Sequence, residues 1–335
     1  MGETNRFRWI DCRAREGRSD DRVAGTGASM ESTRCFPTVA CLGRGRGRSW
    51  PPMANRLVRV LSGCVVLWLV NRLSAGESRV EINPALQGTW RTPEAAWDGR
   101  VLLLFHGFAD DMDGAGDLFK TLSGHLASNG IASLRINFRG EGDRFRTNIT
   151  STFRTRLEDA ASAVQFARRQ SGVKPDRIGA LGWSLGGATA MVSAGESPDR
   201  FRCLVLWSTA SGDMHAGVTG GNFAQVAAQA DREGIGSLEI PGWKTVTLRK
   251  EFFESYRGVD TDRSLARYPG ALLSIRGTED YLPKREPELL KLAPGRPKEA
   301  ILIGGADHIF NVFQPALGHS DRVVALTVDW VKRVL

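Results

Sequence analysis

One short motif constrains this chain of 335 residues more than any other feature. Gly182-Trp183-Ser184-Leu185-Gly186 follows a segment with the pattern of a buried strand, residues 177–182, and precedes a segment with helical character, residues 185–194. A G-x-S-x-G sequence in this position is typical of a sharp strand-to-helix turn that exposes a nucleophilic serine. The glycines are needed because the two backbones approach closely there. We therefore predict that Ser184 is a nucleophile.

From residue 79 the chain alternates between strand-like and helix-like segments, which predicts a mostly parallel sheet with helices on both faces. The expected strands are residues 80–82, 86–90, 101–105, 131–138, 177–182, 201–207, 271–275 and 300–303; the expected helices are residues 118–126, 157–167, 185–194 and 323–334. One interval, between residues 208 and 268, separates two strands that a single helix could join. Because about 60 residues are too many for a plain loop, we expect an inserted lid at about 209–268.

A serine hydroxyl becomes a good nucleophile when a base removes its proton, so a histidine is required. His308 follows the last expected strand on a glycine-rich loop, which emerges at the same edge of a parallel sheet as the serine turn. We predict His308 as the base. The other histidines have less suitable positions: His106 after the first central strand, His125 on a helix, His215 in the insertion and His319 before the last helix.

The imidazolium that forms needs a carboxylate to orient and balance it. Asp280 comes directly after the strand at 271–275, again at the carboxyl edge, and is our prediction. Its neighbour Glu279 is the main alternative, whereas Asp307 is adjacent to His308 in sequence, which disfavours a good side-chain approach. The oxyanion of the reaction should be held by backbone N–H groups, those of Leu185 after the nucleophile and of Phe108 after the strand at 101–105.

Five segments occur in an order that resembles a known family: His106-Gly107-Phe108, residues 134–143, the turn at 182–186, Gly277-Thr278-Glu279-Asp280 and Ala306-Asp307-His308. Together they resemble α/β-hydrolases of the serine aminopeptidase-like group, and within it the cinnamoyl (feruloyl) esterases and the dienelactone-hydrolase-like proteins. The resemblance covers residues 80–335. It implies an α/β-hydrolase fold, a Ser–Asp–His triad, an oxyanion hole after His106-Gly107 and a lid between the sixth and seventh core strands.

The sequence departs from the family pattern at two places. Gly140-Glu141-Gly142-Asp143-Arg144 stands where the family often has Gly-His-Gly-Asp-Ser, which we expect to alter the rim of the pocket. Pro283 follows the acidic residue after three positions instead of four, which leaves the choice between Asp280 and Glu279 open.

The positive charge of the chain lies almost entirely at its N-terminal end. Residues 1–76 hold 13 Arg, no Lys and 6 acidic residues, and so carry +7 of the net charge of +8. The remainder is nearly neutral and has no basic stripe, so nucleic acid is not an expected partner. No Cys/His cluster has the spacing of a zinc site, and the predicted chemistry requires neither a metal nor an organic cofactor.

The N-terminal region divides into two expected segments. Residues 1–52 are rich in Arg, Gly and Ser, so we expect a disordered leader or a mis-assigned start. Residues 53–76 have the pattern of a signal peptide starting at Met53, with basic residues before an apolar run at 60–70 and small residues at 74–76. Residues 77–335 would then be a secreted or periplasmic hydrolase domain with no membrane contact after cleavage. An uncleaved anchor is the alternative.

The expected activity is hydrolysis of a small-molecule carboxylic ester through an acyl-enzyme. An exopeptidase or an acyltransferase on the same fold is the first alternative, and a peptidase could use an acidic residue of the insertion, Glu239, Glu251 or Glu254, to bind a substrate amine. A catalytically silent binding protein is the second. The aromatic residues of the insertion could line an acyl pocket or form the core of the lid: Trp243, Phe252, Phe253 and Tyr256.

Overall fold

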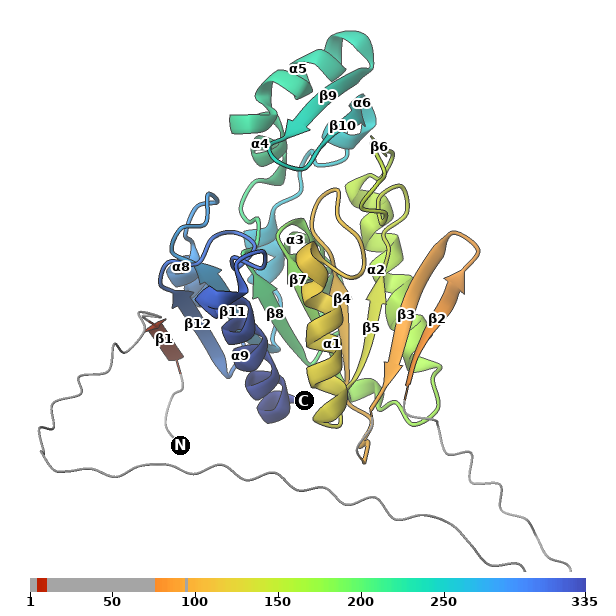
Figure 1. Ribbon diagram of the computed structural model, residues 1–335, viewed down its shortest axis with the longest axis vertical. Helices are drawn as coiled ribbons and strands as arrows, with labels where there is room; N and C mark the ends of the chain where they lie inside the picture. Colours follow the sequence, from red (N-terminus) through yellow and green to blue (C-terminus); the bar gives the residue numbers. More distant parts are fainter. Residues whose placement is uncertain (1–4, 11–75, 94–95) are drawn as a thin grey trace, which may run out of the picture. The chain divides into compact units, whose positions relative to one another are not determined.

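The computed structural model describes residues 5–10, 76–93 and 96–335. These residues form a nine-stranded sheet in the order β1-β12-β11-β8-β7-β4-β5-β3-β2, shown in Figure 1. The strands are β1 (Asn5–Ile10), β2 (Gly76–Asn83), β3 (Leu86–Thr92), β4 (Val101–Phe105), β5 (Ala132–Ile136), β7 (Ile178–Trp183), β8 (Cys203–Trp207), β11 (Ala271–Gly277) and β12 (Lys298–Ile303). β3 runs antiparallel to both β2 and β5, and the other neighbouring pairs are parallel.

Helices cover both faces of this sheet (Figure 1). They are α1 (Leu118–Ser128) and α9 (His319–Val334) on one face, and α2 (Phe153–Arg168), α3 (Leu185–Glu196) and α8 (Glu286–Leu292) on the other. Strands β4 and β8 are buried along their whole length, because apolar clusters lie against both of their faces. This arrangement confirms the predicted fold class; α8 is a helix that the sequence analysis did not predict.

The interval expected to hold a lid, about residues 209–268, forms most of a small domain. Its elements are α4 (Met214–Thr219), α5 (Ala224–Glu233), β9 (Ile235–Ile240), β10 (Lys244–Arg249), α6 (Lys250–Glu254) and α7 (Thr261–Leu265). β10 pairs with β9 and with the short β6 (Asn148–Ile149). In Figure 1 the lid lies beyond the carboxyl ends of the parallel strands. α7 differs from the rest of the interval because it packs against α3.

Three of the four lid aromatics belong to the core of the lid. Phe252, Phe253 and Tyr256 are buried in an apolar cluster that also includes residues of α2 and α3, whereas Trp243 is 47% exposed. Packing in this cluster therefore explains Phe252, Phe253 and Tyr256 without an acyl pocket.

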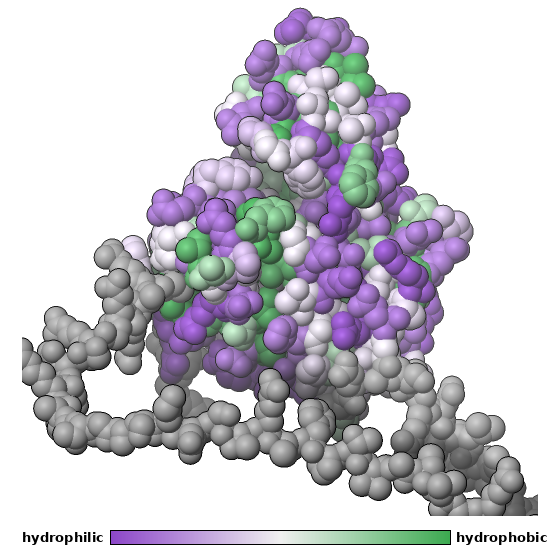
Figure 2. Space-filling model, in the orientation of Figure 1, coloured by the Kyte–Doolittle hydropathy of each residue, from purple (hydrophilic) through white to green (hydrophobic). Residues whose placement is uncertain are grey.

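The outer surface of the molecule is mostly polar. On the face shown in Figure 2, hydrophilic side chains cover the lid and most of the sheet domain, with hydrophobic ones in small patches.

The strand β1 differs from the expectation of a disordered leader or a mis-assigned start, but only for residues 5–10 of the segment 1–52. Residues 5–10 pair in parallel with β12 at the edge of the sheet, and Arg8 forms an ion pair with the nearly buried Glu299. Ile10 packs against the apolar cluster under α9. An edge strand of this kind is held mainly by backbone hydrogen bonds, so composition alone did not predict it. Residues 11–52 are outside the described part of the chain.

The expected signal peptide at 53–76 also lies outside the described residues, except for Gly76, which begins β2. Among the residues that the structure describes, no helix combines the length and apolar character needed to cross a membrane. Signal cleavage and export therefore stay predictions.

Candidate active site

Ser184 occupies the turn between β7 and α3 in a backbone conformation that L-residues rarely adopt, with φ 54° and ψ −117°. The turn is held by a hydrogen bond from the Ser184 N–H to the carbonyl oxygen of Trp207, at 2.9 Å. Its two glycines have no room for a side chain. A Cβ on Gly182 would lie 2.2 Å from the carbonyl oxygen of Gly186, and one on Gly186 would lie 2.0 Å from that of Phe105. The motif thus has the steric cause that the sequence analysis assumed.

Three loops at the carboxyl edge of the sheet bring Ser184, His308 and Asp280 together. The Ser184 Oγ lies 3.1 Å from Nε2 of His308, and Nδ1 of His308 lies 2.8 Å from Oδ1 of Asp280. Ser184 and His308 are partly exposed, whereas Asp280 is buried. In this geometry the imidazole can accept the serine proton at Nε2 while its Nδ1–H donates to the carboxylate.

The Asp280 carboxylate is fixed from two further directions. Oδ1 also accepts a hydrogen bond from the Leu282 N–H at 2.9 Å, and Oδ2 accepts one from Nη1 of Arg276 at 2.7 Å. Burial raises the pKa of Asp280, but the hydrogen bond and charge of His308, followed by the charge of Arg276, lower it to a net value below the ordinary one. Asp280 is therefore ionised at neutral pH.

Arg276 was not singled out in the sequence, although it is the one charged residue of β11. Its guanidinium is fully buried and also donates to Oε1 of Glu286 at 2.6 Å and to the carbonyl oxygen of Thr209 at 2.6 Å. A charged residue inside an apolar strand was the available signal, because such a residue needs a buried partner.

The two alternative carboxylates have other partners. Glu279 is exposed, and its Oε1 lies 3.2 Å from the hydroxyl of Thr278. Asp307 accepts hydrogen bonds from the N–H groups of Ile309 and Asn311, at 2.9 and 2.7 Å, and so stabilises the turn that carries His308. Of the three candidates, Asp280 is the one bonded to the imidazole.

The loop after β4, residues 106–109, lies beside the serine. A Cβ on Gly107 would be 3.4 Å from the Cβ of Ser184, so the segment that contains Phe108 runs next to the first turn of α3. Leu185 opens α3, where N–H groups have no partner within the helix. The Phe108 ring packs against Phe223 and Phe252 of the lid, with centroids 5.6 Å apart in both cases. The two predicted oxyanion donors thus belong to neighbouring segments.

His106 has a structural environment. It is fully buried, its Nδ1 lies 2.8 Å from the Gly107 carbonyl oxygen, and its Nε2 accepts a hydrogen bond from the Phe138 N–H at 3.1 Å. Burial lowers the pKa of His106 to about 4, and the nearby Arg156 charge contributes to that shift. His106 is therefore neutral at pH 7, with Nδ1 as the donor.

The structure places the remaining candidate residues away from the Ser184–His308 pair. His125 is exposed on α1, His215 lies on α4 of the lid, and Nδ1 of His319 contacts Oδ1 of Asn311 at 2.8 Å.

Tyr281 lies against His308 and was not singled out in the sequence. The centroids of the two rings are 4.4 Å apart, and Tyr281 is 71% exposed.

The acidic residues considered as amine anchors are exposed on the lid: Glu239, Glu251 and Glu254. Glu254 lies 3.9 Å from the ammonium of Lys250. Within the described ranges, no cluster of three or more His, Cys, Asp or Glu side chains could hold a metal ion.

Comparison with known proteins gives one family match. The prolyl oligopeptidase family matches residues 119–281, slightly less than half of the chain, a stretch that includes Ser184 and Asp280 and ends before His308. YfhR of Escherichia coli O157:H7, described as uncharacterized, is 30% identical over 155 residues, which are 46% of this chain and 45% of YfhR. An uncharacterized 31.7 kDa protein of the Escherichia coli traX-finO intergenic region is 29% identical over 119 residues, 35% of this chain and 40% of that protein. The chain therefore matches less than half the length of these curated relatives.

Similar solved structures cover the whole α/β domain at low sequence identity. Est1E from Butyrivibrio proteoclasticus, solved with bound ferulic acid, has a TM-score of 0.58 at 16% identity and covers 77% of this chain and 98% of its own. The α/β-hydrolase GrgF from Penicillium sp. sh18 has a TM-score of 0.58 at 15% identity, with coverages of 77% and 99%. Strand order, helical layers and these similarities agree with one another, and the chain has the α/β-hydrolase fold.

Proposed function

We propose that this protein is a serine hydrolase that cleaves a small-molecule carboxylic ester through an acyl-enzyme. The observation that carries the proposal is the unbroken series of contacts from the Ser184 hydroxyl through His308 to the buried Asp280. Such a series makes a serine nucleophilic at neutral pH without a metal.

The reaction would proceed in two halves. In the first, Oγ of Ser184 attacks the ester carbonyl, its proton passes to Nε2 of His308, and the oxyanion accepts hydrogen bonds from the N–H groups of Phe108 and Leu185. His308 then gives that proton to the departing alkoxide oxygen, which leaves as an alcohol. In the second half, His308 takes a proton from water, the hydroxide attacks the acyl-enzyme, and the carboxylic acid leaves as Ser184 is reprotonated. Each oxyanion donor is typically worth about 3 kcal/mol.

The choice of an ester over a peptide rests on a protein of similar fold and on the positions of the acidic lid residues. Est1E, similar in fold, was solved with ferulic acid. The match to the prolyl oligopeptidase family favours the alternative, an exopeptidase. An aminopeptidase needs a carboxylate near the nucleophile for the substrate amine, and the acidic lid residues proposed for this role are exposed, with Glu254 close to a lysine. We therefore place the ester first.

Two measurements on the full chain test the proposal. Turnover of p-nitrophenyl acetate is compared with that of an aminoacyl p-nitroanilide, for the native protein and for Ser184→Ala. We expect faster ester hydrolysis and a loss of several orders of magnitude in the variant. Faster hydrolysis of the anilide would instead identify a peptidase. Failure of a fluorophosphonate probe to label Ser184 in folded protein would favour a silent binding protein.

A further inference from the structure

We propose that Arg156 is a positioning residue that holds both walls of the oxyanion hole in place. The proposal rests on the proposed hydrolase function and assigns a role to a residue that does not touch the substrate. Arg156 lies on α2, and its side chain is completely buried.

The Arg156 guanidinium contacts three separate elements of the fold. Nη2 donates to the carbonyl oxygen of His106 at 2.6 Å, Nη1 to Oε1 of Glu141 at 2.5 Å, and Nε to the hydroxyl of Thr189 at 3.1 Å. These partners belong to the loop after β4, the loop after β5 and helix α3. One planar cation therefore joins the three segments around the serine.

The first wall is the loop that contains Phe108. Arg156 binds the carbonyl oxygen of His106, two positions before Phe108, directly. It restrains Ala109, the residue after Phe108, through Glu141, because Oε2 of Glu141 accepts a hydrogen bond from the Ala109 N–H at 3.0 Å. Ala109 has a φ of 56°, a conformation unfavourable for alanine, so this loop needs such external restraints. The Phe108 N–H lies between the two restrained points.

The second wall is the first turn of α3, which carries Leu185. The Thr189 hydroxyl accepts from Arg156 and donates to the carbonyl oxygen of Leu185 at 3.1 Å. Thr189 thus connects the guanidinium to the peptide between Leu185 and Gly186, which directly follows the peptide that carries the Leu185 N–H. Both oxyanion donors are consequently linked to the same side chain, which fixes the distance between them.

The Glu141 side chain is a buried partner and not a residue of the pocket rim. It is 3% exposed and also accepts a hydrogen bond from the Ser151 hydroxyl at 2.7 Å. Burial raises the pKa of Glu141, but the charge of Arg156 lowers it to a net value below the ordinary one, so the two form an ion pair. A buried ion pair gains little stability over an apolar pair. The Arg156–Glu141 pair does fix the relative positions of its partners, because the N–H groups of a planar guanidinium donate in fixed directions.

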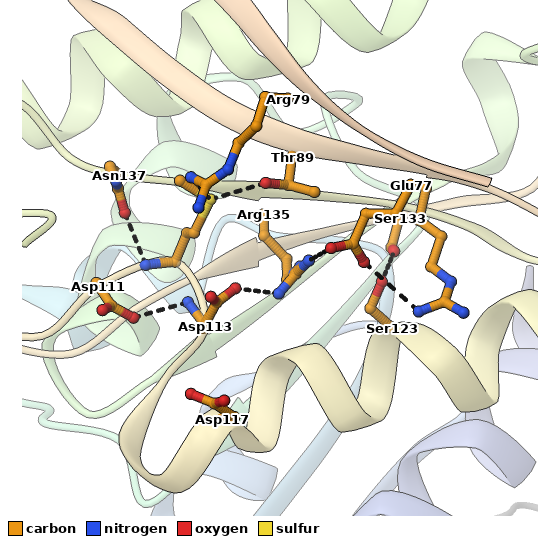
Figure 3. Close-up of polar contacts among 12 residues, drawn as sticks. Glu77, Arg79, Thr89, Asp111, Asp113, Asp117, Ser123, Ser133, Arg135 and Asn137 are labelled. Carbon is orange, nitrogen blue, oxygen red and sulfur yellow. Dashed lines mark hydrogen bonds and ion pairs between the residues drawn. The ribbon is translucent and has the colours of Figure 1, made fainter.

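Arg156→Lys tests this role, and Arg135→Lys is the matched control. Lysine keeps the charge and the ion pair with Glu141, but one ammonium group cannot reach all three partners in the same directions. Arg135 is equally buried, at 1% exposure, and pairs with Glu77 on β2 and with Asp113, which lies beyond the loop at 106–109, as Figure 3 shows. In the part of the chain that the structure describes, neither Glu77 nor Asp113 forms a hydrogen bond with Phe108 or Leu185.

The measurement is the second-order rate constant for labelling of Ser184 by a fluorophosphonate, together with the fraction of molecules labelled. We expect Arg156→Lys to lower the rate constant by about 10- to 100-fold, with full labelling at long times and an unchanged pH dependence. Arg135→Lys should stay within about twofold of the native rate. A merely structural role for Arg156 would lower the labelled fraction or the melting temperature and leave the rate constant of the active fraction unchanged. That result, or an equal loss in Arg135→Lys, would overturn the proposal.

A second pair of variants covers the case in which Arg156→Lys does not fold. Thr189→Val removes the hydroxyl between Arg156 and Leu185 at nearly constant volume, whereas Thr189→Ser keeps it. We expect slower labelling for valine than for serine by about tenfold, and equal rates would refute the role of Arg156. Labelling needs no knowledge of the substrate. An ester panel without turnover would therefore count against the ester proposal alone.

Discussion

Replacing Asp280 with asparagine changes one oxygen into an amide NH2 group and preserves the shape of the side chain. The two Asp280 oxygens accept three hydrogen bonds, Oδ1 from His308 and from the Leu282 N–H, and Oδ2 from Arg276. An asparagine has one oxygen for these donors. It must therefore turn its NH2 group either toward Arg276 or toward His308 and Leu282.

The surroundings decide between these orientations. Arg276 and the Leu282 N–H are donors that cannot become acceptors, whereas neutral His308 can accept at Nδ1. Turning the NH2 group toward Arg276 would lose a charge-assisted hydrogen bond in a fully buried site; the other orientation loses a neutral one. We therefore expect the NH2 group to face His308, which moves the imidazole proton to Nε2. That tautomer cannot accept the Ser184 proton.

The expected loss in kcat is about 10⁴-fold, or about 5.5 kcal/mol of transition-state stabilisation, the size found when the same change produces the wrong tautomer in a serine protease. Steady-state kinetics with p-nitrophenyl acetate measures it, and thermal unfolding establishes that the variant is folded. Glu279→Gln is the control, because Glu279 is the exposed neighbour, and its kcat should stay within about twofold of native. If Asp280→Asn keeps more than a tenth of the native kcat, the assigned orientation of His308 is wrong.

Two further predictions concern stability, each measured by urea denaturation. Gly186→Ala should lower the free energy of unfolding by about 3 kcal/mol or more, because its Cβ would lie 2.0 Å from the Phe105 carbonyl oxygen. Gly217→Ala is the control, because Gly217 lies in α4 with no atom within 4 Å of an added Cβ. This second variant should raise the free energy of unfolding by about 0.5–1 kcal/mol. Similar values for both would contradict the steric account of the turn. Burial raises the pKa of Asp110 to about 7. The unfolded chain then loses this proton at lower pH than the folded protein, so the Asp110 contribution should decrease stability by about 3 kcal/mol between pH 5 and pH 8. Asp110→Asn should remove that decrease, and an unchanged pH dependence would exclude Asp110 as its source.

The strands of the sheet were predictable because burial on both faces leaves a clear pattern. β4 was predicted at its observed bounds, Val101–Phe105, since apolar residues fill all of its positions. β1 was not predictable, because an edge strand can leave large apolar side chains exposed; Phe7 is 49% and Trp9 67% exposed. Its position depends on pairing with β12, which lies about 290 residues away in sequence.

The sequence predicted which residues meet at the candidate site, but it predicted less well where their side chains point. Ser184 and His308 follow strands that end at the same edge, so topology alone brings them close. Adjacent residues such as Glu279 and Asp280 differ instead in where their side chains point. That difference depends on the Leu282 N–H and on Arg276, which become partners after the chain has folded. The same reason explains why Glu141 was expected at the rim and is buried.

Two buried arginines hold loops at the carboxyl edge of the sheet. Loops at this edge lie beyond the backbone hydrogen bonds of the strands, so their peptide groups need other partners. Arg276 holds Asp280, and Arg156 holds the loop that contains Phe108. Burying two guanidinium groups costs free energy that apolar residues would not cost. Because both restrain a segment that borders Ser184 and not the centre of a core, we attribute their presence to the geometry of the site and not to the stability of the fold.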